Sequence, residues 1–180
     1  KILPSHRIYV AGASGLAGSA ICRSLKKYGY GNKELGGELL KPSRKELDLS
    51  DLSKVQNWFT KNNPDIVIIA AAKVGGILAN SSHPADFLLE NIKIQTNIIE
   101  SSYLFGVKRL IFLGSSCIYP KFALQPIKEE SLLDGELEST NEWYAIAKIA
   151  GIKLCEALRI QKRFDAISLM PTNLYGPGDN

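Results

Sequence analysis

The chain has 180 residues, enough for one domain with a sizeable hydrophobic core. Hydrophobic residues make up 45% of it and charged residues 22%, and no uncharged apolar run reaches the length of a membrane span. The net charge of +4 is mild and the basic residues are scattered, which argues against a stripe that binds nucleic acid. Cys22, Cys117 and Cys155 show no CxxC spacing, which argues against a disulfide framework or a metal site and favours a reducing, cytoplasmic environment.

The first predicted element is a strand, residues 7–11, that runs directly into a glycine-rich turn and then into an amphipathic helix. A dinucleotide-binding turn requires this order, because glycines let the backbone approach a pyrophosphate and the start of the helix offers free N–H groups. The alternative is a tight turn between strand and helix that holds no ligand. The turn consists of Gly12, Ala13, Ser14, Gly15, Leu16, Ala17 and Gly18.

A second strand, residues 38–41, leads to the position at which a dinucleotide site selects its cofactor. An acidic residue there would bind the ribose hydroxyls, whereas an arginine would pair with a 2′-phosphate. This chain has Arg44, flanked by Ser43 and Lys45, and no carboxylate before Glu46. We therefore expect NADP(H) rather than NAD(H), with a solvated basic turn as the alternative.

The rest of the chain alternates between helices and buried strands. Helices are expected at about 51–62, 84–105 and 142–163, and strands at 65–72, 107–114 and 165–170. The loop 73–77 follows a strand buried on both faces, at the edge where open α/β sheets place ligands. Helix 84–105 is apolar on more than one face, which suggests contact with a partner subunit. The alternation predicts an α/β fold with a doubly wound, mostly parallel, Rossmann-like sheet.

Tyr144 and Lys148 lie four residues apart in the last predicted helix, so both side chains emerge on one face. An ammonium beside the phenol is expected to lower its pKa toward the range of a proton donor and acceptor. Ser115, at the carboxyl end of the 107–114 strand, would complete a polar grip on a carbonyl oxygen. Together these three side chains suit hydride transfer to a ketone or from an alcohol. The alternative is a surface pair in which the lysine only lies along the ring.

Several segments resemble one family, in the order in which they occur. With the glycine turn they are similar to the short-chain dehydrogenase/reductase superfamily, in its extended, sugar-nucleotide-modifying branch, over about residues 7–180. The block 115–121 is specific within that superfamily, since relatives usually carry another residue where Cys117 stands. The segments are 71–77 (AAKVGGI), 84–87 (PADF), 114–122 (GSSCIYPKF), 141–151 (NEWYAIAKIAG) and 170–177 (MPTNLYGP).

The resemblance implies a two-stage reaction on one GDP-sugar: 3,5-epimerisation of GDP-4-keto-6-deoxy-D-mannose, then reduction of its C4 ketone by NADPH to give GDP-L-fucose. In such enzymes Cys117 would be the base of the epimerisation, with a buried structural thiol as the alternative. Tyr144 and Ser115 would hold the ketone oxygen, and Lys148 would bind the nicotinamide ribose. The implied cofactor contacts are Gly12, Ala13, Ser14, Gly15, Leu16, Ala17, Gly18, Arg44, Asp48, Leu49, Leu113, Gly114, Ser115, Ser116, Lys148, Pro171, Thr172, Asn173 and Leu174.

Two features depart from the family pattern. Ala13 and Ser14 stand where the family commonly has His-Arg, so cofactor choice depends more on Arg44. The histidine that should act with Cys117 is expected beyond Asn180, because neither His6 nor His83 has a suitable position.

The resemblance also implies an assembly. Residues 1–180 are expected to form the NADP-binding Rossmann domain of a longer two-domain enzyme whose C-terminal substrate domain is largely missing, so the activity of the chain as given stays open. A homodimer is expected through helices 84–105 and 142–163. Two rival functions are another NAD(P)-dependent sugar-nucleotide epimerase or dehydratase, and a noncatalytic dinucleotide-binding module.

Overall fold

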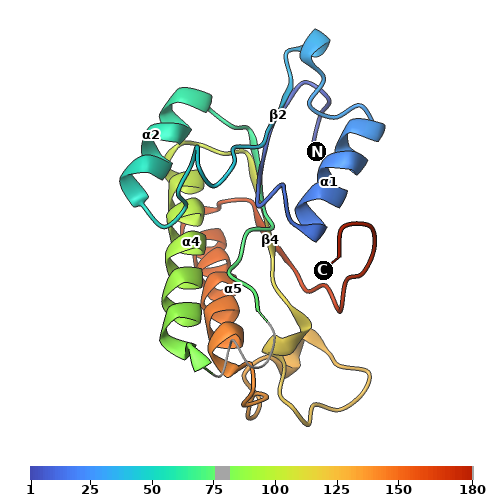
Figure 1. The fold of residues 1–180 in the computed structure, drawn as a ribbon, viewed down its shortest axis with the longest axis vertical. Coiled ribbons are helices and arrows are strands. Elements are labelled where there is room, and N and C mark those ends of the chain that lie inside the picture. Colours follow the sequence, from blue (N-terminus) through green and yellow to red (C-terminus); the bar gives the residue numbers. More distant parts are fainter. Residues whose placement is uncertain (76–81, 180) are drawn as a thin grey trace.

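The computed structural model describes residues 1–75 and 82–179, in which strands and helices alternate along the chain (Figure 1). Within these residues, no helix is long and apolar enough to cross a membrane. The strands and α-helices are β1 (Arg7–Ala11), α1 (Leu16–Lys27), β2 (Glu38–Leu40), α2 (Leu52–Asn62), β3 (Ile66–Ile69), α4 (Pro84–Leu104), β4 (Arg109–Leu113), α5 (Glu142–Lys162) and β5 (Ala166–Leu169).

The described strands form one sheet in the order β2-β1-β3-β4-β5, and every neighbouring pair is parallel. The chain steps outward from β1 to β2 and then returns to the other side of β1 to form β3. This reversal is the topological switch point of a doubly wound fold, and ligands bind in the crevice that it opens at the carboxyl ends of the strands. The predicted fold class is confirmed.

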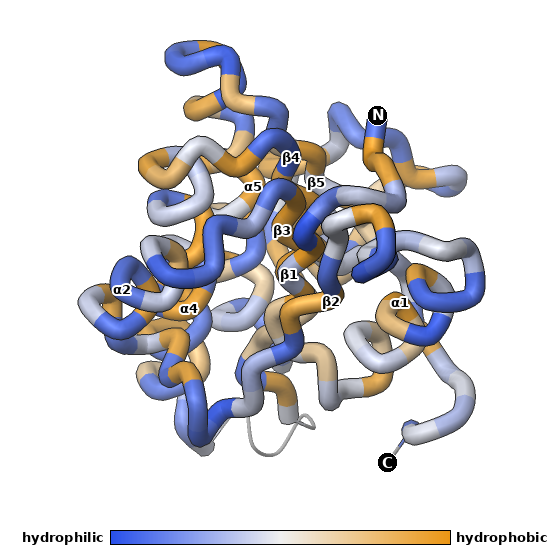
Figure 2. The backbone as a smooth tube through the Cα atoms, turned by 90° about the horizontal axis from the view of Figure 1, so that it is seen from above, coloured by the Kyte–Doolittle hydropathy of each residue, from blue (hydrophilic) through white to orange (hydrophobic). Residues whose placement is uncertain are grey.

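Three layers are visible from above, with the hydrophobic strands in the middle, α1 on one side and α2, α4 and α5 on the other (Figure 2). Alternation along β1 explains the layers, because successive side chains point to opposite faces. Ile8 and Val10 pack with α1, whereas Tyr9 faces α2, where its ring centroid lies 4.5 Å from that of Trp58.

Helices α4 and α5 pack against each other on one face of the sheet. The buried Gln95 of α4 donates a hydrogen bond from its Nε2 to the carbonyl of Ala147 in α5, at 2.5 Å. Gly151, one turn later, lets α5 approach the sheet closely: a Cβ there would lie 2.7 Å from the Phe112 ring. These contacts fix the turn of α5 that carries Tyr144 and Lys148.

Apart from β1, the predicted strands are longer than the observed ones, and β3 differs most, at its carboxyl end. Strand β3 ends at Ile69 instead of continuing to residue 72, because residues 70–72 leave the sheet and line a cleft. Asp51 caps the start of α2, since its carboxylate accepts a hydrogen bond from the Lys54 backbone N–H at 3.1 Å.

Candidate active site

A cleft of about 1070 Å³ opens where the carboxyl ends of β1, β3 and β4 meet. It brings together all but two of the residues predicted as catalytic or cofactor-binding, the exceptions being Ser116 and Cys117. The predicted residues that line it are Gly12, Ala13, Ser14, Gly15, Leu16, Ala17, Gly18, Arg44, Asp48, Leu49, Leu113, Gly114, Ser115, Tyr144, Lys148, Pro171, Thr172, Asn173 and Leu174.

The glycine turn has no room for side chains at two positions. Gly12 has φ +81°, and a Cβ there would lie 2.7 Å from the backbone N and Cα of Ala71. A Cβ on Gly18 would collide with the backbone carbonyl of Gly12. Helix α1 starts directly after Gly15 and carries no acidic residue in its first turn. Its positive dipole end and free N–H groups therefore face the cleft, where they suit a pyrophosphate.

Lys148 is fixed at the inner end of the cleft. Its side chain is 4% exposed, and its Nζ donates a hydrogen bond to the Leu113 carbonyl at 2.8 Å. The same Nζ lies 5.7 Å from the centroid of the Tyr144 ring and 4.8 Å from that of Phe112. Tyr144 and Lys148, which were predicted to share one face of the helix, line this cleft together with Ser115 from the end of β4.

Burial sets the protonation of this pair. It lowers the pKa of Lys148 to about 8, and it raises the pKa of Tyr144 to about 12, with the charge of Cys117 adding to the latter shift. The expectation that the ammonium lowers the Tyr144 pKa is therefore wrong for this state of the protein. Removing the phenol from water disfavours the charged phenolate, and this burial is the largest cause of the raised Tyr144 pKa.

Cys117 is the middle residue of a short 3-10 helix, Ser116–Ile118, which directly follows Ser115 and does not line the cleft. Its backbone N–H donates to the Ser115 hydroxyl at 3.4 Å. Burial raises the pKa of its thiol, and the Ser115 hydrogen bond and the Lys148 charge oppose that rise. The Ser116 N–H donates to the Pro171 carbonyl at 3.1 Å, which holds the 171–174 segment at the same edge of the sheet.

The two histidines lie where the sequence analysis placed them, away from this chemistry. His6 is buried before β1, and its Nδ1 accepts a hydrogen bond from the Leu3 N–H at 3.1 Å. His83 immediately precedes α4 and is exposed.

Comparison with known proteins agrees with this geometry. A family profile described as "NAD dependent epimerase/dehydratase family" matches residues 8–180. The chain belongs to this family.

Named relatives within the family are similar over almost the whole chain. It is 59% identical to a protein named "Putative GDP-L-fucose synthase 2" of Arabidopsis thaliana, covering 98% of this chain and 52% of that protein. It is 51% identical to "GDP-L-fucose synthase" of Escherichia coli K12, covering 99% of this chain and 54% of that protein. The chain thus spans about half the length of these curated relatives.

Solved structures give the same result. "MlghC, GDP-mannoheptose C4 reductase from Campylobacter jejuni with NADP bound" superimposes with a TM-score of 0.93 at 39% identity, covering 100% of this chain and 55% of that one. A "gdp-l-fucose synthetase from Naegleria fowleri bound to NADP" superimposes with a TM-score of 0.85 at 32% identity, covering 100% and 54%. The epimerase/dehydratase fold assignment thus agrees with close structural neighbours.

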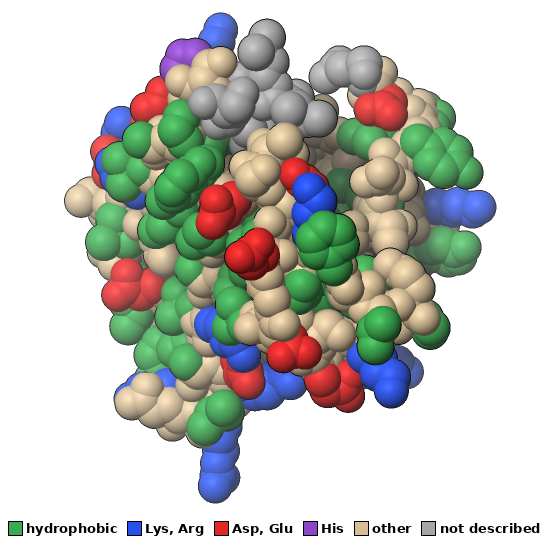
Figure 3. All heavy atoms as spheres, turned by 90° about the horizontal axis from the view of Figure 1, so that it is seen from below, with side chains coloured by type: hydrophobic (Ala, Val, Ile, Leu, Met, Phe, Trp, Pro, Cys, Tyr) green, Lys and Arg blue, Asp and Glu red, His purple; other side chains and the backbone are tan. Residues whose placement is uncertain are grey.

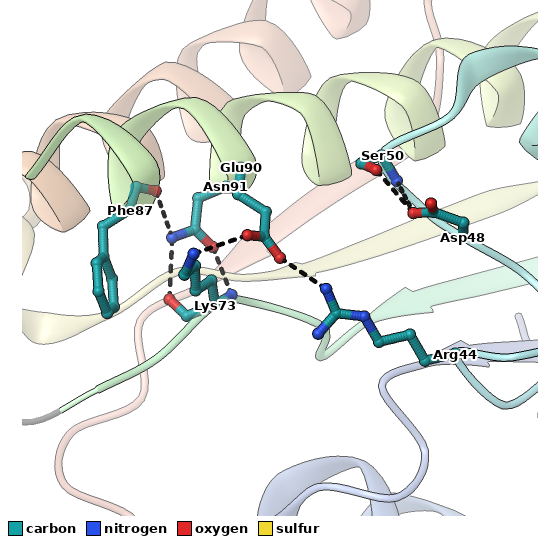
Figure 4. Close-up of polar contacts among 7 residues, drawn as sticks. All are labelled: Arg44, Asp48, Ser50, Lys73, Phe87, Glu90 and Asn91. Carbon is teal, nitrogen blue, oxygen red and sulfur yellow. Dashed lines mark hydrogen bonds and ion pairs between the residues drawn. The ribbon is translucent and has the colours of Figure 1, made fainter. Parts of the chain in front are cut away.

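The end of the cleft that contains Arg44 carries a charge cluster that the sequence analysis missed (Figure 4). Arg44, whose side chain is 87% exposed, contacts the Glu90 carboxylate through Nη2 at 3.2 Å. The other oxygen of Glu90 contacts Lys73 Nζ at 2.8 Å. Buried Asn91 beside it donates to the Lys73 and Phe87 carbonyls and accepts from the Lys73 N–H. Asn91 thereby fixes the backbone that follows β3.

Other lining residues were missed for two reasons. Residues 70–72 were assigned to a strand, and residues such as Ile94 and Asp179 lie far along the chain from the glycine turn. The 73–77 loop was expected at the ligand edge, and Lys73 and Val74 do line the cleft. Gly76 and Ile77 lie outside the described residues.

The lowered pKa of Lys148 leads to a pH-dependent stability. Between pH 8 and 10.5 the unfolded chain holds the lysine proton and the folded chain does not, so stability rises with pH across this window. Relative to Lys148→Met, the wild type should gain up to about 3 kcal/mol of unfolding free energy as pH rises from 7.5 to 10. Urea unfolding of the wild type and of Lys148→Met at several pH values measures this change in unfolding free energy.

The difference between the two proteins removes the contributions of Cys22 and Cys155, on which Lys148 does not act, and leaves that of Lys148 together with its coupling to Cys117. Parallel curves for wild type and Lys148→Met would contradict the lowered pKa.

Proposed function

We propose that the chain is the NADP-binding domain of an NADPH-dependent GDP-L-fucose synthase, which converts GDP-4-keto-6-deoxy-D-mannose to GDP-L-fucose by 3,5-epimerisation and reduction. The observation that carries the proposal is the single cleft lined by the glycine turn, Ser115, Tyr144 and Lys148. The names of the relatives and the NADP in two neighbouring structures support it.

The cleft fits a dinucleotide. The space above Gly12 and Gly18, where no Cβ fits, together with the uncapped start of α1, would hold the pyrophosphate. Arg44 would hold the 2′-phosphate, and residues 171–174 would lie along the nicotinamide. NADPH, when bound, supplies the hydride for the C4 carbon of the sugar.

The remaining steps belong to the residues of this chain. Ser115 donates a hydrogen bond to the ketone oxygen, and Tyr144 donates the phenolic proton to that oxygen as hydride reaches C4. The phenolate that remains is stabilised by the Lys148 ammonium, whose lowered pKa lets it exchange protons with water near neutral pH. For this step the Tyr144 pKa of about 12 suits an acid that stays protonated until the reaction.

For epimerisation we assign the base to Cys117. Its thiolate would take the proton from a carbon beside the ketone, while Ser115 and Tyr144 stabilise the enolate oxygen. Because burial raises the thiol pKa, the thiolate depends on the Ser115 hydrogen bond and the Lys148 charge. The partner acid would come from outside residues 1–180.

The surface supports a larger assembly. On the α1 side of the sheet, Ile111, Leu113 and Ile167 are only partly buried and Leu169 is 47% exposed, so this face is available to further chain. Hydrophobic side chains also reach the surface on the face that carries the 119–139 loop (Figure 3). We propose that a second, substrate-binding domain packs against these two exposed apolar regions. We also propose a homodimer that forms through α4 and α5.

The dimer and the cellular location are separate parts of the proposal. Apolar side chains that would join the interface include Leu89 and Leu104 of α4 and Ile160 of α5, all exposed. Light scattering at micromolar concentration should give twice the mass of the chain, and a monomer would refute this part. The three free cysteines suit a cytoplasmic enzyme.

The deciding experiment uses the full product of the reading frame. NADPH absorbance is followed after adding GDP-4-keto-6-deoxy-D-mannose, and the product sugar is analysed. Stoichiometric NADPH oxidation with formation of GDP-L-fucose is expected. Saturable NADPH binding without oxidation would support a noncatalytic dinucleotide-binding module instead. Oxidation with a product epimerised at other carbons would assign another member of the family.

A further inference from the structure

Glu90 contacts Arg44, the residue proposed above to bind the cofactor's 2′-phosphate. Its carboxylate projects from α4 into the cleft, with one oxygen 3.2 Å from Arg44 Nη2 and the other 2.8 Å from Lys73 Nζ (Figure 4). Arg44 follows β2, the strand whose end contacts the adenosine ribose in doubly wound folds. A carboxylate therefore already neutralises the guanidinium that the phosphate needs.

The two ion pairs of the Glu90 carboxylate differ in how firmly the cation is held. Lys73 is partly buried, its Nζ lies 5.4 Å from the centroid of the Phe87 ring, and Asn91 fixes its backbone. Arg44 is 87% exposed and free to swing on a flexible side chain. An incoming anion can therefore displace Glu90 from Arg44 while Glu90 stays bound to Lys73.

A second carboxylate, Asp48, lies close enough to Arg44 for the two charges to interact. Asp48 accepts hydrogen bonds from the Ser50 N–H and hydroxyl, at 3.0 and 2.7 Å, and these bonds, with a smaller part from Arg44, hold its pKa below the usual range. Asp48 is thus ionised, and with Glu90 it opposes the two cations Arg44 and Lys73. A phosphate entering this end of the cleft therefore meets two carboxylates as well as the cations Arg44 and Lys73.

We propose that Glu90 is a specificity-determining residue that competes with the 2′-phosphate of the cofactor for Arg44 and so narrows the preference for NADPH over NADH. The inference rests on the proposed function, since it concerns the same cleft. NADH carries no 2′-phosphate, so it does not need Arg44 to leave Glu90. NADPH does, and each binding event costs the Arg44–Glu90 ion pair.

The test measures dissociation constants of NADPH and NADH by nucleotide fluorescence at low ionic strength. Glu90→Gln should strengthen NADPH binding by roughly two- to fivefold and leave NADH within error, as expected for removing one exposed ion pair. The gain should shrink in added salt. Glu100→Gln, which removes the same charge from an exposed position of α4 outside the cleft, should change neither constant.

A double mutant shows which cation is responsible. With Arg44→Ala in the background, Glu90→Gln should no longer strengthen NADPH binding. A gain that persists without Arg44, an equal gain for NADH, or no gain at all would overturn the inference while NADPH binding itself upholds the proposed function. Failure of the wild type to bind either nucleotide would instead refute the proposed function.

Discussion

Tyr144→Phe is expected to lower the rate of ketone reduction by about 10²- to 10⁴-fold, the usual contribution of a positioned general acid. The phenolic hydroxyl is the proton donor proposed for the ketone oxygen, and phenylalanine keeps the ring beside the Lys148 ammonium while removing that proton. NADPH binding should change little, because we propose that the glycine turn and Arg44, rather than Tyr144, hold the phosphates of the cofactor. Single-turnover NADPH oxidation and a separate binding titration measure the two quantities.

The matched control is Tyr103→Phe in α4. That ring packs against Phe164 with centroids 6.0 Å apart and does not line the cleft, so the change should leave the rate unaffected. If Tyr144→Phe retained most of the wild-type rate, as Tyr103→Phe is expected to do, proton donation by Tyr144 would be excluded.

The second large effect is expected at the glycine turn. Gly12→Ala should destabilise the fold by about 2–5 kcal/mol, the sum of left-handed backbone strain and of forcing a methyl group into a packed site. The new Cβ would lie 2.7 Å from the backbone of Ala71, which cannot move without shifting the residues after β3. Urea unfolding measures the stability, and NADPH affinity should fall with it because the turn itself is displaced.

Gly36→Ala separates the two causes. Gly36 has φ +82°, almost the same as Gly12, but a Cβ there would meet nothing within 4 Å. Gly36→Ala should therefore lose only about 1–2 kcal/mol of unfolding free energy, the cost of the left-handed backbone strain, with NADPH affinity unchanged. Equal losses of stability in the two variants would mean that the close approach of Gly12 to Ala71 has no energetic weight.

Most of the fold follows from local patterns that the sequence displays. Strand β1 was predicted with its observed bounds because a glycine with positive φ directly follows it. The ends of β3 and β5 were placed too late, because the residues that follow each strand keep its apolar character. After β3 these are alanines that line the cleft, and after β5 it is Met170, which packs against the core. Composition alone does not show where the ladder of hydrogen bonds stops.

The candidate site was predictable where its residues sit at the ends of strands or one helical turn apart. Two properties were not. The Tyr144 pKa depends on burial by several elements at once, so a rule based on the nearby Lys148 gave the wrong direction. The Glu90–Arg44 contact joins residues 46 positions apart on α4 and on the loop after β2, and no spacing rule links them.

The central claim is that one cleft holds a dinucleotide with its reactive end against Tyr144, Lys148 and Ser115. A crystal structure of the protein with NADP⁺ tests it most directly. We expect the pyrophosphate to lie over the turn from Gly12 to Gly18. We expect the nicotinamide end of the cofactor to lie against Tyr144, Lys148 and Ser115. A nucleotide bound elsewhere, or one whose nicotinamide lies away from Tyr144, would contradict it.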